Sequence, residues 1–250
     1  MNLYKLRSLV VTALLLVAIG CNKDGEIPEF VVNNSVRPVD FLTENSYNIL
    51  NIEVAYVEGY QPDPATLNNL VTLLSQRLNK SHGVTVTQRT MPATGRVNID
   101  LDAIRNLERT QRKSVTSGKT LTAWIMFLDT EYSESTSTSK VLGITYGASS
   151  IAIFEKSVYA YVQPDMPARA TLETVVIEHE FGHVMGLVDN GTPMVTSHKD
   201  PDHGSHCSNT ACLMYWKTEE NVNLADLLGT ASYPTFDANC LADLKAAGGK

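Results

Sequence analysis

Two histidines spaced four residues apart, His179 and His183, carry the chemistry that is easiest to recognise in this chain of 250 residues. On a helix such residues project from one face, so their imidazoles can bind the same metal ion. Glu180 projects beside the pair, where its carboxylate can take a proton from a water that the ion activates. Three apolar residues fall on the same side of the predicted helix, which is therefore expected to point inward: Leu172, Val175 and Val176.

A glycine and a methionine follow the histidine pair at informative positions. Gly186 is suited to end the helix in a left-handed conformation and to turn the chain back toward the ion. Met214 lies further on, in the segment CLMYW. Together these features resemble the metzincin zinc peptidases, in which HExxHxxG is followed by a methionine turn beneath the metal. The resemblance covers residues 179–186 and 206–215. It implies a zincin-like fold, a Zn²⁺ cofactor, a protein or peptide substrate, and Glu180 as general base of a metalloendopeptidase.

The third metal ligand is open, because the metzincin pattern HExxHxxGxxH has histidine where this chain has Asp189. Asp189 could itself bind, since a carboxylate oxygen is an acceptable zinc donor. The other solution is His206, which directly precedes Cys207. A ligand histidine before Cys-x4-Cys-x-Met resembles the archaemetzincin arrangement, although the C-terminal CxxC of that group is absent here. We favour His206, which gives the ion three neutral imidazoles. Two histidines of the intervening loop are rival ligands: His198 and His203.

Four cysteines occur, and two of them, Cys207 and Cys212, are close enough in sequence to be the expected disulfide in an oxidising compartment. A bridge between them would hold His206 near Met214 and reduce the ordering cost of the loop before it. The same pair could instead bind a second metal. Cys240 is then left over, and we expect it to be a buried thiol.

Helices and strands alternate before residue 165, and the chain after residue 190 is rich in loops. A continuous apolar run over 121–128 has the length of a buried central strand. By the metzincin resemblance, residues 146–154 are placed at a sheet edge that pairs with substrate. The expected fold is α/β (α+β) and zincin-like, with a mixed twisted sheet, an active-site helix and a loop-rich C-terminal subdomain. The acids of the polar loop 189–205 could bind calcium together with loop carbonyls.

The first twenty residues resemble a bacterial lipoprotein signal. Lys5 and Arg7 form a positive end, and the apolar run over 9–19 is too short for an ordinary membrane span. The segment Ala18-Ile19-Gly20-Cys21 resembles a lipobox, which implies cleavage before Cys21 and a lipid on that residue. We therefore expect three parts: a signal peptide 1–20, a polar tether 21–45, and a zinc metallopeptidase domain 46–250.

The formal net charge is −7, and loss of Lys5 and Arg7 with the signal would make it more negative. Such a surface repels polyanions, so nucleic acid is not an expected partner. We expect a monomer in the bacterial cell envelope, anchored at the outer membrane through lipid on Cys21. The alternative is a non-catalytic envelope binding or adhesion lipoprotein on a zincin scaffold. Glu180 favours the enzyme, since a purely structural site needs no carboxylate beside the ion.

Overall fold

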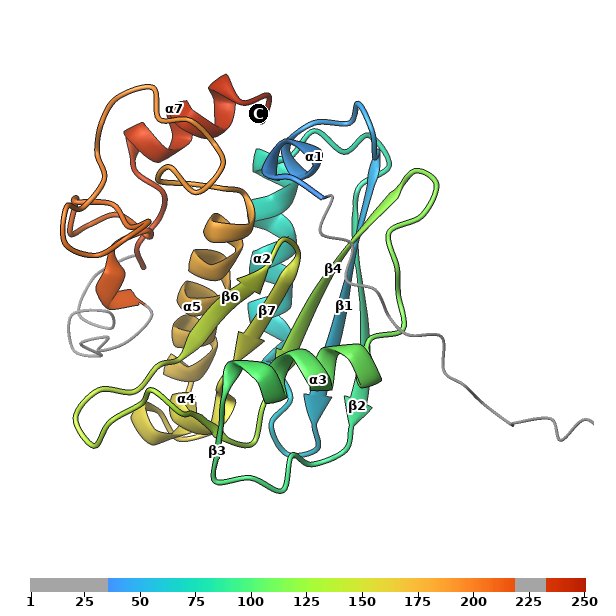
Figure 1. The fold of residues 1–250 in the computed structure, drawn as a ribbon, viewed down its shortest axis with the longest axis vertical. Coiled ribbons are helices and arrows are strands. Elements are labelled where there is room, and N and C mark those ends of the chain that lie inside the picture. The colour runs from blue at the N-terminus through green and yellow to red at the C-terminus, as the bar shows by residue number, and fades with distance from the viewer. Residues whose placement is uncertain (1–35, 219–232) are drawn as a thin grey trace, which may run out of the picture.

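The computed structural model describes residues 36–218 and 233–250, which form a five-stranded main sheet with helices on both faces and a small two-stranded sheet of β3 (Asn98–Ile99) and β5 (Glu131–Tyr132) (Figure 1). The expected α/β fold with a mixed sheet and a histidine-bearing helix is confirmed. In chain order the elements are α1 (Pro38–Leu42), β1 (Ile49–Val57), α2 (Pro64–Arg77), β2 (Val84–Met91), β3 (Asn98–Ile99), α3 (Leu101–Gln111), β4 (Thr120–Phe127), β5 (Glu131–Tyr132), β6 (Gly143–Gly147), β7 (Ser150–Ile153), α4 (Glu155–Tyr161), α5 (Ala168–Val184), the 3-10 helix η1 (Trp216–Thr218) and α7 (Ala238–Ala246).

The main sheet has five strands in the order β2-β1-β4-β7-β6. The first four run parallel, whereas β6 pairs antiparallel with β7 and forms one edge. The apolar run over 121–128 forms nearly all of β4, an interior strand, as expected. The prediction that residues 146–154 form the edge of the sheet is wrong. The edge strand is β6, and β7 within that segment lies between β4 and β6.

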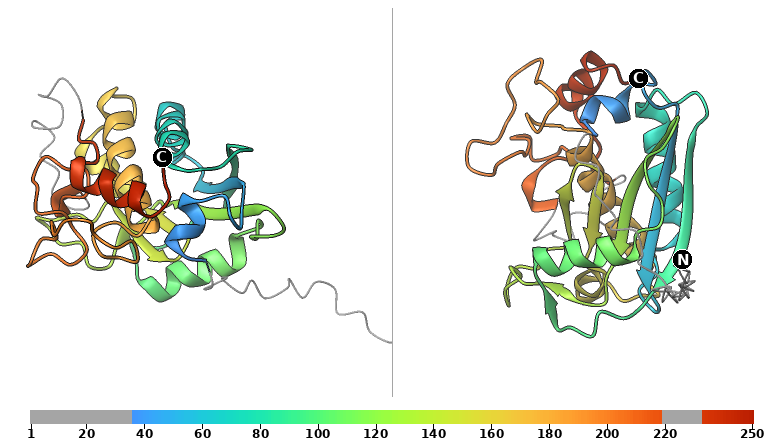
Figure 2. Two further views of the ribbon diagram at one scale, coloured as in Figure 1. Left: turned by 90° about the horizontal axis from the view of Figure 1, so that it is seen from above. Right: turned by 45° about the vertical axis from the view of Figure 1, so that its right-hand side comes forward.

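Each face of the sheet has its own hydrophobic core. Helices α2 and α5 cover one face, where Leu70, Ile125 and Phe181 are fully buried. Helix α3 covers the other face and packs Ile104 near Trp124. Figure 2 shows these two helical layers on opposite sides of the strands. Since burying a large apolar side chain contributes about 1.5–3 kcal/mol, both layers hold the sheet firmly, and α5 is fixed along its length.

The N-terminal boundary of the folded domain lies earlier than the sequence suggested. Residues up to 45 were expected to be tether, yet Pro38–Leu42 form helix α1, in which Phe41 and Leu42 are fully buried. The ring of Phe41 meets that of Phe181 on α5 edge to face, with centroids 6.1 Å apart. The end of the expected tether is therefore part of the core, and the folded domain already includes residues 36–45, before the expected start at residue 46.

Residues 1–35 lie outside the described residues, so the signal peptide, the lipid on Cys21 and most of the tether stay predictions. In the ranges that the structure describes, no helix has the length and hydrophobicity needed to cross a lipid bilayer.

Candidate metal centre

Helix α5 ends at the glycine that the sequence singled out. Gly186 has φ +76°, and its N–H donates to the carbonyl of His183 at 3.0 Å, while the N–H of Leu187 donates to that of Gly182 at 3.1 Å. This pair of bonds is a Schellman motif, which needs a left-handed residue after the helix. A Cβ on Gly186 would also lie 2.7 Å from a ring carbon of Pro38. The chain therefore turns sharply just after the histidine pair.

After Leu187 the backbone is left-handed again at Val188 and Asp189, and this turn carries Asp189 away from the histidines. Val188 and Asp189 have φ values of 55° and 62°, an unfavourable conformation for a branched residue such as valine. Val188 is fully buried, whereas the side chain of Asp189 is 61% exposed and lies 3.7 Å from Nζ of Lys199. The side chain that occupies the third-histidine position of the family motif thus faces solvent and a lysine.

His206 occupies the place beside the pair instead. One ligand nitrogen each of His179, His183 and His206 lies within 4.8 Å of the other two. The Nε2 atoms of His179 and His183 are 3.1 Å apart. The ring of His206 is centred 5.3 Å from the first and 5.0 Å from the second. Two nitrogens that each lie about 2.1 Å from one tetrahedral zinc ion are about 3.4 Å apart, so this spacing fits a shared ion.

Backbone carbonyls orient two of the three rings. Nδ1 of His179 donates to the carbonyl oxygen of Leu213 at 2.6 Å. Nδ1 of His206 likewise donates to the carbonyl oxygen of His203. A proton held at Nδ1 leaves the lone pair of Nε2 for a metal, which is the usual way in which proteins orient ligand histidines. The donor set is therefore of the right chemistry for zinc.

Glu180 is fully buried beside the histidines and is contacted by the edge strand. The hydroxyl of Thr145 on β6 lies 2.8 Å from the Glu180 side-chain oxygen Oε2 and 2.8 Å from its main-chain carbonyl oxygen. Gly143, two residues earlier, faces the same side chain, because a Cβ there would lie 2.9 Å from Oε1 of Glu180. No motif in the sequence pointed to Gly143 or Thr145.

Met214 lies against helix α5, as the methionine-turn resemblance implied. It is fully buried, and its sulfur occupies the space that a Cβ on Gly182 would need. The N–H of Cys207 donates to the carbonyl of Met214 at 2.7 Å, which closes the segment that bears His206. The residue before Met214 supplies the carbonyl that orients His179. One compact turn thus positions both the third histidine and the first.

The two rival histidines of the polar loop lie elsewhere. His203 stacks on Trp216, with ring centroids 4.2 Å apart, and its Nδ1 is 2.9 Å from Oδ1 of Asp200. The N–H of Asp202 also donates to that carboxylate and is the main cause of the lowered pKa of Asp200. Among the residues that the structure describes, the acids of loop 189–205 are not gathered into a group of three ligand-bearing side chains, as a calcium site would require.

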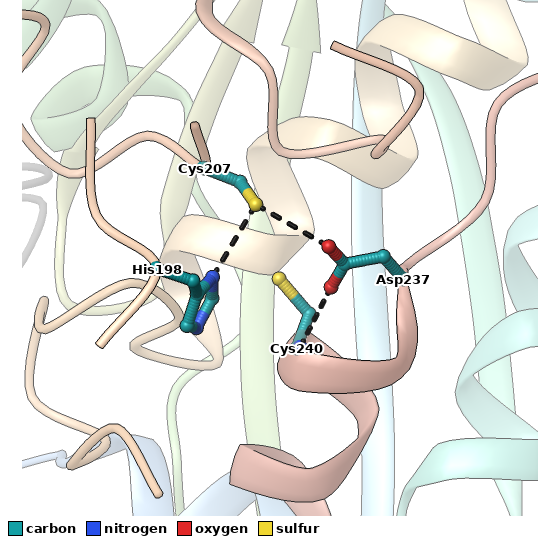
Figure 3. Close-up of side chains that lie close together, drawn as sticks. All are labelled: His198, Cys207, Asp237 and Cys240. Carbon is teal, nitrogen blue, oxygen red and sulfur yellow. Dashed lines mark hydrogen bonds between the residues drawn. The ribbon is translucent and has the colours of Figure 1, made fainter. Parts of the chain in front are cut away.

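A second group of ligand-type side chains surrounds His198 (Figure 3). Its Nδ1 lies 3.3 Å from the sulfur of Cys207, which is 3.5 Å from Oδ2 of Asp237. Nε2 of His198 lies 2.7 Å from Oδ2 of the fully buried Asp243, and this contact fixes the orientation of the His198 ring. Cys240 completes the group, and ligand atoms of His198, Cys207, Asp237 and Cys240 all lie within 4.8 Å of one another. We call these four residues the His198 cluster.

The expected disulfide between Cys207 and Cys212 is wrong. Both are free thiols, and so is Cys240, which is fully buried as expected. The sulfur of Cys212 lies 3.6 Å from that of Cys240 rather than bonded to Cys207. A hydrogen bond from Cys240 lowers the pKa of Cys212 to about 7, whereas burial raises that of Cys207 to about 12. The turn between the two close cysteines directs Cys207 toward His198 instead.

The fold is that of a zincin-type α/β domain, similar to archaemetzincin. It matches the crystal structure of archaemetzincin from Methanopyrus kandleri with a TM-score of 0.52 at 16% identity, over 81% of this chain and 96% of the other. A zinc-dependent peptidase from Methanocorpusculum labreanum matches with a TM-score of 0.47 at 15% identity, over 77% of this chain and 99% of the other. No protein-family model matches the sequence, and no curated protein is significantly similar to it.

Proposed function

We propose that the chain is a zinc-dependent endopeptidase whose ion is held by His179, His183 and His206. The observation that carries this proposal is the convergence of the three imidazoles, with the two helical Nε2 atoms 3.1 Å apart. Two of the rings are oriented by backbone carbonyls that favour metal binding at Nε2. The HExxHxxG segment and the methionine beneath it give the same reading from the sequence.

A bound zinc ion would supply water activation near neutral pH and polarisation of a scissile carbonyl group. Glu180 lies next to the first ligand and contributes the general base that accepts a proton from the attacking water. The same carboxylate can return the proton to the departing amine, so the bond is hydrolysed without a covalent intermediate. Burial of Glu180 strengthens its electrostatic interactions and restricts its motion.

Strand β6 is the surface that would align a peptide substrate. It is an edge of the five-stranded sheet and lies against α5 next to Glu180. An extended peptide can add to such an edge through main-chain hydrogen bonds. Because pairing of this kind is independent of side chains, it supports hydrolysis of peptide bonds over hydrolysis of unrelated small molecules.

The His198 cluster is a second candidate metal centre, with a structural role. Histidine nitrogen and cysteine sulfur are zinc donors, and the contact between His198 and Asp243 is the carboxylate–histidine pairing found behind metal ligands. Cys207 is the residue after His206, so an ion in the cluster would also steady the third ligand of the catalytic site. We assign no catalytic step to this cluster.

The location of the enzyme is proposed from the N-terminal sequence alone. The lipobox-like segment ending at Cys21 supports a lipid-anchored protein of the bacterial cell envelope, probed most directly by radiolabelled palmitate incorporation and its loss in Cys21→Ala. A non-catalytic binding lipoprotein on the same scaffold is the competing function. The buried carboxylate of Glu180 beside the histidines favours the enzyme.

The test compares the purified protein with three variants for bound zinc and for cleavage of an unfolded generic protein substrate. We expect His206→Ala to lose one zinc equivalent and the activity, Asp189→Ala to keep both, and Glu180→Gln to keep its zinc while losing turnover about 10²- to 10⁴-fold. Zinc loss in Asp189→Ala alone would show that the third ligand is wrongly assigned. Undiminished proteolysis in Glu180→Gln would refute the mechanism, and a zinc-replete protein without any hydrolytic activity would favour the binding lipoprotein.

A further inference from the structure

Strand β6 presents two different faces to the molecule. Alternation along a strand places residues two apart on the same side. Gly143 and Thr145 face helix α5, where they contact Glu180. Ile144 and Tyr146 pack on the opposite face of the sheet, against the core beneath α3. The apolar pair therefore fixes the rotation of the strand, and that rotation aims the other two residues at Glu180.

The absence of a side chain at Gly143 leaves room for the Glu180 carboxylate. A Cβ at this position would lie 2.9 Å from Oε1 and 3.0 Å from Cγ of Glu180, and 2.8 Å from a methyl carbon of Val176. Contacts this short require something to shift. Val176 and Glu180 are both fully buried, so a side chain at residue 143 would displace one or both of them. The backbone of Gly143 thus packs directly against one side of the Glu180 carboxylate.

Thr145 holds the same side chain by a hydrogen bond. Its hydroxyl is 2.8 Å from Oε2 and 2.8 Å from the main-chain oxygen of Glu180, so a single proton can be donated to either acceptor. Both acceptors belong to Glu180, so the Thr145 hydroxyl keeps the Glu180 carboxylate close to the backbone of helix α5. A hydrogen bond to a charged acceptor is about twice as strong as a neutral one, which makes this tie effective.

The main-chain groups of the same two residues point to the open edge of the sheet. The N–H of Phe154 donates to the carbonyl of Leu142, and this hydrogen bond comes directly before the Gly143–Ile153 pair in the register of β6 with β7. In an antiparallel pair, hydrogen-bonded and non-hydrogen-bonded residues alternate. Gly143 and Thr145 are therefore non-hydrogen-bonded residues of this pair, so their N–H and C=O groups are directed away from β7.

We propose that Gly143 and Thr145 are positioning residues that set the Glu180 carboxylate for proton transfer, on the same edge strand that pairs with the substrate main chain. This inference rests on the proposed function. It adds that one strand both aligns the substrate and positions the general base. The main chain of Gly143 and Thr145 faces the substrate, and the same two residues contact Glu180. Loss of the Thr145 hydroxyl then reduces turnover rather than zinc binding.

The test uses Thr145→Val, which keeps the shape of the side chain and removes the donor. We expect an unchanged zinc content and melting temperature, a KM close to that of the wild type, and a kcat lowered about 10- to 100-fold, as for a misplaced catalytic group. Thr145→Ser restores the hydroxyl and should recover most of the lost kcat. Thr87→Val is the matched control, because Thr87 is an exposed threonine on β2, the opposite edge strand.

A crystal structure of the Thr145→Val variant provides a readout that does not depend on turnover. The Glu180 carboxylate should leave the position it has in the wild type, while the three histidines stay in place. An unchanged kcat, an unmoved carboxylate, or a Thr145→Ser variant as impaired as Thr145→Val would overturn the inference. Glu180→Gln is measured in parallel. If that variant is inactive and Thr145→Val is fully active, only the positioning role fails, whereas an active Glu180→Gln removes the proposed function itself.

Discussion

The Nε2 atoms of His179 and His183 face each other at 3.1 Å across one turn of helix α5. Two imidazole nitrogens at this distance can share one proton or one metal ion, but two protonated rings would repel each other. The turn that carries Met214 and Leu213 holds the first ring from below. The three contacts thus hold the two rings in an arrangement that suits a shared cation.

Zinc should therefore stabilise the folded protein strongly. A ligand that binds only the native state contributes about 4 kcal/mol when its free concentration is about 1,000 times its Kd. We expect a clear rise in melting temperature with buffered zinc over protein treated with a chelator, measured by calorimetry. His183→Ala should lose a large part of this rise. Equal melting temperatures for the zinc-loaded and the chelated wild type would contradict the account.

Gly182 is the position at which helix α5 meets Met214 most closely. Replacing an interior helix glycine by alanine normally stabilises a helix by about 1 kcal/mol. Here the added carbon would meet the Met214 sulfur and lie 3.2 Å from a ring carbon of Phe236. We expect Gly182→Ala to destabilise the fold by about 1–3 kcal/mol in urea unfolding. Ser75→Ala, on the exposed face of α2, is the control and should be neutral or slightly stabilising. A stabilised Gly182→Ala would show that Met214 is not packed as described.

The His198 cluster predicts a second metal equivalent. Zinc-replete wild-type protein should contain two ions per chain, and His198→Ala should retain one and unfold at a lower temperature. His203→Ala is the matched control, because His203 stacks on Trp216 and lies in neither ligand group. The measurement is metal analysis by mass spectrometry after gel filtration. Two ions retained in His198→Ala, or one in the wild type, would argue against a metal in this cluster.

A buried carboxyl pair, Glu155 at the start of α4 and Glu173 in α5, predicts a dependence of stability on pH. Burial, together with the charge of Glu173, raises the pKa of Glu155 well above its usual value, and Arg169 lies 3.4 Å from one and 3.1 Å from the other carboxylate. A folded-state pKa above the unfolded one means that the native state binds more protons, so stability is lost as pH rises through the folded-state pKa. Glu155→Gln removes this titration.

We therefore expect the stability of Glu155→Gln relative to the wild type to increase between pH 5 and pH 8, by about 1 kcal/mol, a typical scale for one buried change. Urea unfolding at the two pH values measures the difference. Parallel pH dependence in the two proteins would show that Glu155 does not take up a proton on folding.

The sequence predicted the parts of the site and fold that a local sequence pattern determines. HExxH requires a helix, Gly186 requires a left-handed turn, and the apolar run of β4 requires a buried strand; each of these is present. The position of Met214 against α5 was also predicted, because its segment resembles a methionine turn in its spacing of histidine, cysteine and methionine.

Other features depend on tertiary packing that no local pattern carries. Helix α1 has only five residues, and its burial depends on the distant ring of Phe181. The edge of the sheet was assigned to residues 146–154, which contain β7 rather than the edge strand β6, although the fully buried SIAI sequence of β7 is typical of an interior strand. The cysteine pairing was wrong because closeness in sequence does not determine where two side chains point on a turn.

The most direct test of the account is anomalous diffraction at the zinc edge from crystals grown with Zn²⁺. We predict a peak within about 2.0–2.1 Å of Nε2 of His179, His183 and His206, with Asp189 remote from it. A zinc-soaked crystal with no peak between these three rings, or with a peak bound by Asp189 in place of His206, would contradict the central claim.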